Sequence, residues 1–206
     1  MSEQIYLGIC VEGQTEAMFV KYVLARYLIK YNIILADPIN LNGNINISRI
    51  TKILSIMSSQ YDYVTTLYDF YGFQNKLQNE THIELAQRIL DNIDEEHRFN
   101  IIPYVQKYEF ESLLYSDISI LCKNLYSDLK DIQQCEIDFI NDTKDKFPED
   151  INDSIATAPS KRIQKIFKKY KKGVYGYIIA QDIGIDKIRQ KCPNFSLWLD
   201  RLINLS

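Results

Sequence analysis

Residues 5–16 read IYLGICVEGQTE, and this stretch decides the fold. An apolar run ends at the acid–glycine pair Glu12-Gly13, and a helix-compatible segment begins at once. Short apolar runs with a glycine stop are typical of buried strands in a parallel sheet. Ligands of such sheets collect at the carboxyl ends of the strands, so we expect Glu12 on a ligand-binding edge. Glu16 lies in the first helical turn, where an acid complements the helix dipole.

The same pattern recurs along the first half of the chain. Residues 61–68 predict a strand that ends at Asp69, and residues 99–105 predict a strand that is followed by Glu109 and Glu111. A further short strand is predicted over residues 33–39, and helical apolar spacing covers residues 14–31, 48–58 and 81–96. Strands that alternate with helices indicate βαβ units, so we predict an α/β fold with a mainly parallel sheet flanked by helices.

The 206 residues are expected to form a single domain. Residues 1–117 would be its α/β core. Residues 118–206 would be a mostly helical C-terminal elaboration, because helical apolar spacing continues from Tyr175 to Leu205.

The net charge, the cysteine spacing and the absence of certain motifs argue against several classes of protein. The net charge of −3 argues against a protein that coats nucleic acid through bulk charge. The four cysteines form no C-x-x-C pair, so neither zinc nor a disulfide framework is expected. No signal-peptide pattern and no apolar run near the ~18 residues of a membrane span occur, so we expect a cytoplasmic protein without a membrane partner. P-loop, dinucleotide-binding and nucleophile-elbow motifs are also absent from the sequence.

Acids at three strand ends predict a cation site. Parallel strands share one carboxyl edge, so Glu12, Asp69 and the pair Glu109/Glu111 can converge there as catalytic residues. Converging carboxylates have raised pKa values or bind a divalent cation, and oxygen ligands suit Mg²⁺ or Mn²⁺. We assign Glu12, Asp69 and Glu111 as metal ligands. Glu109 is the alternative to Glu111, because residues two apart on a helix face different ways.

Residues 161–172 carry seven bases and no acid. A solvated helix face accounts for such a run. Alternatively, Ser160 caps a helix whose N-terminus, with Lys161 and Arg162, binds a phosphate of the substrate. Acids that hold a metal beside bases that hold phosphate would suit hydrolysis of a phosphodiester, with either Glu12 or a metal-bound hydroxide as the base.

Six motifs together resemble a known family. They are Val11–Glu16, Asp69–Gly72, Tyr108–Glu111, Pro148–Asn152, Pro159–Arg162 and Cys192–Trp198. The chain resembles, over nearly its whole length, an uncharacterised family (domain of unknown function 4276) with a Toprim-like fold. Topoisomerases, primases and OLD-family nucleases share the Toprim fold, in which a glutamate after the first strand and a later D-x-D pair bind Mg²⁺. The resemblance implies that Glu12 is this glutamate and Asp69 the first aspartate, whereas Tyr71 stands where the second aspartate is expected.

Two functions follow from these observations. The first is a Mg²⁺- or Mn²⁺-dependent phosphodiester hydrolase, a nuclease that acts on nucleic acid. The second is a non-catalytic, Toprim-shaped binding module that acts with a partner ATPase, which the resemblance implies in the setting of defence against phage. Tyr71 favours the module, and the remaining acids and the basic run favour the enzyme. The sequence indicates no particular oligomeric state.

Overall fold

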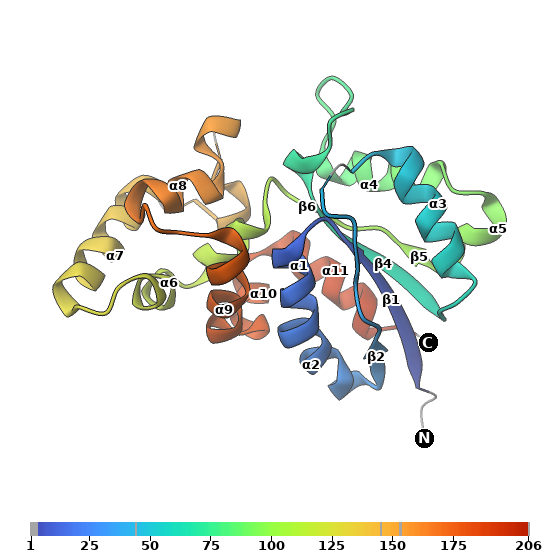
Figure 1. Ribbon diagram of the computed structural model, residues 1–206, viewed down its shortest axis with the longest axis horizontal. Coiled ribbons are helices and arrows are strands. Elements are labelled where there is room, and N and C mark those ends of the chain that lie inside the picture. The colour runs from blue at the N-terminus through green and yellow to red at the C-terminus, as the bar shows by residue number, and fades with distance from the viewer. Residues whose placement is uncertain (1–3, 44, 145, 153, 206) are drawn as a thin grey trace.

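The computed structural model describes residues 4–43, 45–144, 146–152 and 154–205, and its centre is a parallel sheet (Figure 1). The strands are β1 (Ile5–Val11), β2 (Ile33–Leu35), β3 (Ile39–Asn40), β4 (Tyr63–Asp69), β5 (Ile101–Ile102) and β6 (Val105–Gln106). β2 and β3 pair with β1, β5 and β6 pair with β4, and each pairing is parallel. Val11 lies opposite Leu67 in the β1–β4 pair, so the two central strands end at the same edge. The predicted α/β class with a mainly parallel sheet is confirmed.

Helices cover both faces of this sheet and also form a second, helical half (Figure 1). The helical segments are α1 (Gln14–Phe19), η1 (Val20–Leu24), α2 (Ala25–Leu28), η2 (Ile29–Tyr31), α3 (Ile47–Ser58), η3 (Phe70–Gly72), α4 (His82–Asp91), α5 (Glu95–Arg98), η4 (Phe110–Ser116), α6 (Ile118–Leu125), α7 (Leu129–Thr143), η5 (Pro148–Asp150), η6 (Ile155–Thr157), α8 (Pro159–Ile166), α9 (Lys172–Ile183), α10 (Ile185–Lys191) and α11 (Pro193–Ile203). Side chains of β1 alternate between two cores. Leu7 and Ile9 pack with α1, α2, α9 and α11, whereas Cys10 packs with α3 and α4.

Most predicted elements form, with breaks at specific residues. The helix predicted over residues 14–31 is one helical run from α1 to η2 that contains a π-helical turn, η1. The strand predicted over residues 99–105 is interrupted at Pro103, which has no N–H to donate to a ladder, and β5 lies at the edge of the sheet. The helix predicted over residues 81–96 begins after the cap Thr81 and is divided into α4 and α5.

The cysteine prediction needs one correction. Cys122 and Cys135 form a disulfide that joins α6 to α7, with their Cα atoms 5.8 Å apart. Their separation of 13 residues matches no cysteine motif, so the pairing cannot be predicted from spacing. Cys10 and Cys192 are buried free thiols.

The C-terminal helices pack against the sheet, and Glu149 holds one of them in place. The Glu149 side chain is buried and its carboxylate accepts hydrogen bonds from the backbone N–H of Asn194 (2.8 Å) and Phe195 (3.0 Å). A carboxylate at this place satisfies N–H groups that the first turn of α11 leaves unpaired. This contact gives a structural role to two of the six motifs, Pro148–Asn152 and Cys192–Trp198.

α9 lies close against α1, and this contact positions the candidate site. A Cβ atom at Gly176 of α9 would lie 2.6 Å from Thr15 Cγ2 of α1, so only glycine permits the observed approach. The approach sets the first residue of α9, Lys172, beside Glu16 in the first turn of α1.

We predict that Gly176→Ala destabilises the protein by about 1–3 kcal/mol, because the added methyl group forces α9 away from α1. Urea denaturation measures the effect. Gly173→Ala is the matched control in the same helix, since a Cβ there meets nothing within 4 Å. The control should be neutral or stabilise by up to about 1 kcal/mol. Equal effects of the two substitutions would contradict the assigned close approach.

Candidate functional site: a carboxylate cluster

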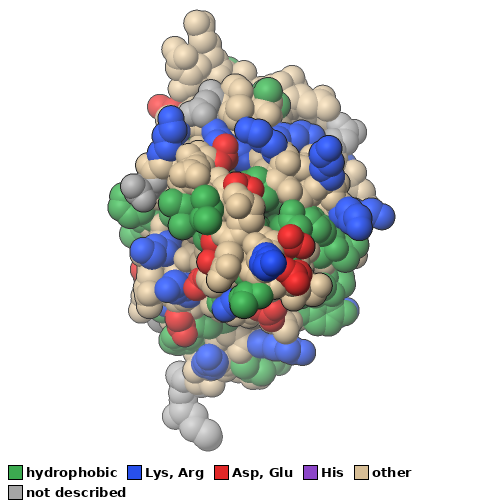
Figure 2. Space-filling view, turned by 90° about the vertical axis from the view of Figure 1, so that its left-hand side faces the viewer, with side chains coloured by type: hydrophobic (Ala, Val, Ile, Leu, Met, Phe, Trp, Pro, Cys, Tyr) green, Lys and Arg blue, Asp and Glu red, His purple; other side chains and the backbone are tan. Residues whose placement is uncertain are grey.

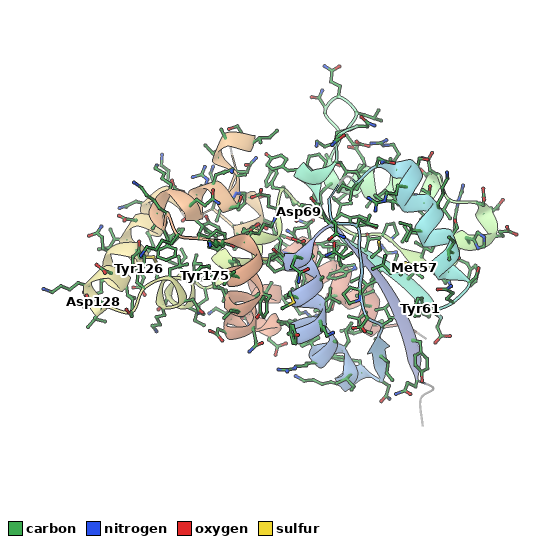
Figure 3. The ribbon with its side chains drawn as sticks, in the orientation of Figure 1. Met57, Tyr61, Asp69, Tyr126, Asp128 and Tyr175 are labelled. Atoms are coloured by element: carbon green, nitrogen blue, oxygen red, sulfur yellow. A yellow bond between two sulfur atoms is a disulfide. The ribbon has the colours of Figure 1, made fainter. Side chains whose placement is uncertain are left out.

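Glu12 and Asp69 meet where β1 and β4 end, as the sequence predicts. The backbone N–H of Asp69 donates to Glu12 Oε2 over 3.0 Å. Asp69 Oδ1 in turn accepts from the backbone N–H of Phe110 over 2.7 Å, which brings the start of η4 to the same edge. Figure 3 shows Asp69 at the junction of the sheet with the helical half. The shared carboxyl edge of the sheet is therefore the platform of the site.

Lys172 enters this edge from α9. Its Nζ lies 2.7 Å from Asp69 Oδ2, 3.0 Å from Glu111 Oε2 and 3.8 Å from Glu16 Oε1. Its side chain is 35% exposed, whereas those of its three partners are at most 5% exposed. One ammonium group thus serves three buried carboxylates from three different elements.

Two of these carboxylates keep unused acceptor capacity. Among the described residues, Lys172 is the only group that pairs with the buried oxygens Glu16 Oε1 and Glu111 Oε2. The other oxygen of Glu111 accepts from the Tyr170 hydroxyl over 3.2 Å. A buried acceptor without a hydrogen bond is costly, so two oxygens that face one ammonium indicate a site built for a cation.

Burial and mutual repulsion dominate the electrostatics of the cluster. Burial, reinforced by the charge of Asp69, raises the pKa of Glu12 and that of Glu16 to about 7. Burial likewise raises the pKa of Glu111 to about 7, although Lys172 opposes the shift, and it raises the pKa of Asp69. Burial disfavours the charged form of Lys172, but Asp69, Glu111 and Glu16 together hold its pKa well above the usual value. At neutral pH the cluster therefore binds protons or cations readily.

Glycine makes room for the Glu12 carboxylate. A Cβ atom at Gly72 would lie within 2.5 Å of the carboxyl atoms of Glu12, so this carboxylate fits only against a glycine. Gly13 does not need the conformational freedom of glycine. Its φ of −149° is extended, and a Cβ there would lie 3.2 Å from Glu16 Oε2.

Glu109 and Glu111 both reach the site, by different routes. Tyr108 adopts a left-handed conformation (φ +66°), after which Glu109 is extended and Glu111 lies in the 3₁₀ helix η4. Glu111 contacts Lys172, and Glu109 Oε2 accepts from the backbone N–H of Ser160 over 2.9 Å. The predicted phosphate site at the start of α8 is thus used by a carboxylate of the protein. Ser160 lies inside α8 instead of capping it.

The two predicted phosphate-binding bases differ in their surroundings. Arg162 is buried, and its guanidinium binds Asp142 Oδ2 (2.6 Å) and the carbonyl of Thr157 (2.8 Å). Lys161 is exposed, as are most of the bases that follow it up to Lys171. Figure 2 shows Lys and Arg side chains gathered across the upper part of the α6–α8 end of the molecule. The exposed lysines, and not Arg162, form this basic surface.

An apolar groove of about 390 Å³ lies elsewhere, between α4 and α11. It is lined by Ile83, Leu90, Leu197 and Trp198 among others, and by no acid. The groove therefore does not provide the chemistry of the carboxylate edge.

The chemical character of the donor set fits a hard divalent cation. It consists of carboxylate oxygens, and two of the buried ones pair with no described group other than Lys172. Such oxygens are the ligands that Mg²⁺ and Mn²⁺ prefer. In the described part of the chain no three Asp, Glu, His or Cys side chains already stand in a metal-binding arrangement. Lys172 lies among the acids, so a metal ion would have to replace its ammonium group.

Two members of the cluster were not predicted as site residues. The sequence predicts that Glu16 complements the helix dipole, but the residue is 2% exposed and its carboxylate faces Lys172. Lys172 is the last residue of the basic run, and only its position at the start of α9 distinguishes it from its solvated neighbours. The Gly-x-Tyr-Gly sequence that follows Lys172 was a usable signal, because small residues in a helix often mark a close approach.

These features define an α/β protein with a cluster of carboxylates, paired with Lys172, at the carboxyl ends of its central parallel strands. The family model described as "Domain of unknown function (DUF4276)" matches residues 11–203, and the chain belongs to this family. No curated protein and no solved structure matches the chain. Within the described residues, none of the helices has the length and apolar character needed to cross a membrane.

The raised pKa values of Glu12, Glu16 and Glu111 predict that stability falls as pH rises. The folded protein holds these protons up to about pH 7, whereas the unfolded chain releases them near its ordinary value of 4.5. The unfolding free energy should therefore decrease between about pH 5 and pH 7, by up to about 1.4 kcal/mol per pH unit for one such carboxyl.

Thermal melts in EDTA at pH 5.5 and pH 8 measure this effect. Glu16→Gln cannot ionise at this position and should show a smaller pH slope than the wild type. Glu95→Gln, an exposed acid in α5, is the control and should keep the slope. An unchanged slope in Glu16→Gln would contradict the raised pKa of Glu16.

Proposed function

We propose that the protein is a Mg²⁺- or Mn²⁺-dependent phosphodiester hydrolase, a nuclease of Toprim-like architecture. The supporting observation is the convergence of Asp69, Glu111 and Glu16 on one lysine ammonium, with Glu12 hydrogen-bonded to the backbone N–H of Asp69 beside them. A bound divalent ion would supply Lewis-acid activation of the phosphodiester and of the attacking water.

Different residues would bind the metal ion, accept a proton and bind the substrate. Glu12, Asp69 and Glu111 would hold the ion, and Glu16 adds a further, buried carboxylate beside them. The pKa of Glu12, about 7, suits a group that accepts a proton near neutral pH, because general bases act best near the operating pH. Lys161 and its exposed neighbours would bind the backbone of the substrate, since ammonium groups neutralise phosphates.

A second candidate function is a non-catalytic, Toprim-shaped module that acts with a partner ATPase. Its support is Tyr71, which stands in place of the second acid and whose hydroxyl accepts a hydrogen bond from Asn152 Nδ2. Lys172 favours the same alternative, because it balances the charge of the acids without a metal. A role in defence against phage, which the family resemblance implies, is part of both proposals. The two candidates differ in whether metal ions bind and whether a phosphodiester is cut.

The hydrolase predicts metal-dependent cleavage that the anchor residues support. Wild-type protein should cut at least one of single-stranded DNA, duplex DNA, supercoiled plasmid and RNA in Mg²⁺ or Mn²⁺. Asp69→Asn and Glu12→Gln should each lose about a hundredfold or more of the rate, because a metal ligand or its orientation is removed. Labelled substrates resolved on gels measure the rate, and Glu95→Gln should remain fully active. Cleavage that survives both site substitutions would remove this site from the reaction, and folded protein without any cleavage would favour the binding module.

Competition between Lys172 and the metal predicts a distinctive behaviour of Lys172→Met. In EDTA this variant should melt at a lower temperature than the wild type, because buried carboxylates lose their counterion. It should bind Mn²⁺ more tightly, by about tenfold, and regain stability when the ion is added. Titration calorimetry and thermal melts measure both effects. Lys171→Met, at the exposed preceding residue, should change neither, and weaker Mn²⁺ binding by Lys172→Met would refute the competition.

A further inference from the structure

Two tyrosines lie beside the carboxylate cluster. Tyr71 follows Asp69 by two residues, and Tyr108 directly precedes Glu109. The backbone N–H of Tyr71 donates to the carbonyl of Tyr108 over 3.1 Å, so the two segments are held together. Their ring centroids are 5.5 Å apart at an interplanar angle of 38°. The pair is therefore attached to two acids of the site through the backbone.

The left-handed backbone conformation of Tyr108 indicates a function for its side chain. Its φ of +66° is a conformation that glycine or asparagine adopts easily and a bulky side chain adopts at a cost. The change of chain direction that brings Glu109 and Phe110 to the site needs only this backbone conformation. A tyrosine at this position indicates a function for its side chain, since strained residues persist mainly at functional sites.

Neither tyrosine is a core residue. Both are partly exposed, and Phe70 extends the group with its ring 6.2 Å from that of Tyr71. Asn152 holds the Tyr71 hydroxyl through a hydrogen bond. Two ammonium groups accompany the rings. Lys107 Nζ, which is ion-paired with Asp150, lies 5.6 Å from the Tyr108 ring, and Lys76 Nζ, which donates to the carbonyl of Phe73, lies 5.3 Å from the Phe70 ring. Aromatic rings for bases and cations for phosphates are the combination that binds single-stranded nucleic acid.

We propose that Tyr71 and Tyr108 stack an unpaired nucleobase next to the carboxylate cluster, which makes single-stranded nucleic acid the substrate. This inference rests on the proposed phosphodiester hydrolase. It gives Tyr71, the residue that stands in place of a second aspartate, a role in substrate recognition. A base in a duplex is stacked on its neighbours and offers no free face, so the site selects strands whose bases are unpaired.

Binding can be measured separately from cleavage. Fluorescence anisotropy in EDTA compares a labelled oligothymidylate, an abasic strand of equal length and a duplex. We expect wild-type protein to bind the oligothymidylate about tenfold more tightly than the other two ligands. Tyr71→Leu and Tyr108→Asn should lose this preference without weakening the binding of the abasic strand. Tyr71→Phe and Tyr108→Phe keep the rings and should retain it.

Tyr108→Asn also separates recognition from folding. Asparagine accepts the left-handed backbone more readily than tyrosine, so the variant should remain folded while its preference for bases is lost. Equal binding of the base-bearing and abasic strands by the wild type, or a preference that survives both substitutions, would overturn the inference. Base-dependent binding without metal-dependent cleavage would leave the stacking site and refute the hydrolase. Metal-dependent cleavage without base-dependent binding would support the hydrolase and refute the stacking site.

Discussion

The structure depends on one charge balance, that between Lys172 and the buried carboxylates around it. Asp69, Glu111 and Glu16 come from the end of β4, from η4 and from α1, and each would be costly to bury as an unpaired charge. The ammonium of Lys172 can pair with all three carboxylates only if α9 begins beside the first turn of α1. The close contact between Gly176 and Thr15 provides this position. The helical half and the sheet are thus joined by electrostatics as well as by their common apolar core.

The parts of the site that the sequence predicts are those that local pattern and sheet geometry determine. β1 and β4 are recognisable from their apolar and β-branched residues, and parallel pairing brings their ends together whatever the rest of the chain does. Glu12 and Asp69 follow directly from this rule, and Glu111 follows because η4 begins just after the next strand segment, β6. The domain outline, with an α/β first part and a helical second part, likewise follows from periodicity alone.

The remaining parts depend on contacts between distant segments. Lys172 is 103 residues from Asp69, and its charge resembles that of its exposed neighbours in the basic run. Arg162 shows the opposite case, because an apparently exposed base is buried against Asp142 of α7. The prediction that only one of Glu109 and Glu111 reaches the site rests on α-helical spacing between them. The left-handed turn at Tyr108 and the 3₁₀ helix after it bring both residues to the same edge.

Although no second aspartate follows β4, other elements bring carboxylates to this edge. In the D-x-D arrangement two acids come from one turn, so local geometry sets their spacing. Here Asp69 is the only acid of that turn, and Glu111 and Glu16 provide carboxylates from two other elements. The distances between these carboxylates therefore depend on how η4, α1 and α9 pack. Lys172 contacts Glu16, Asp69 and Glu111 at the same time. A cation that replaced this ammonium would meet a set of oxygens assembled by tertiary structure, so the affinity of the site for metal and the packing of α9 are expected to change together.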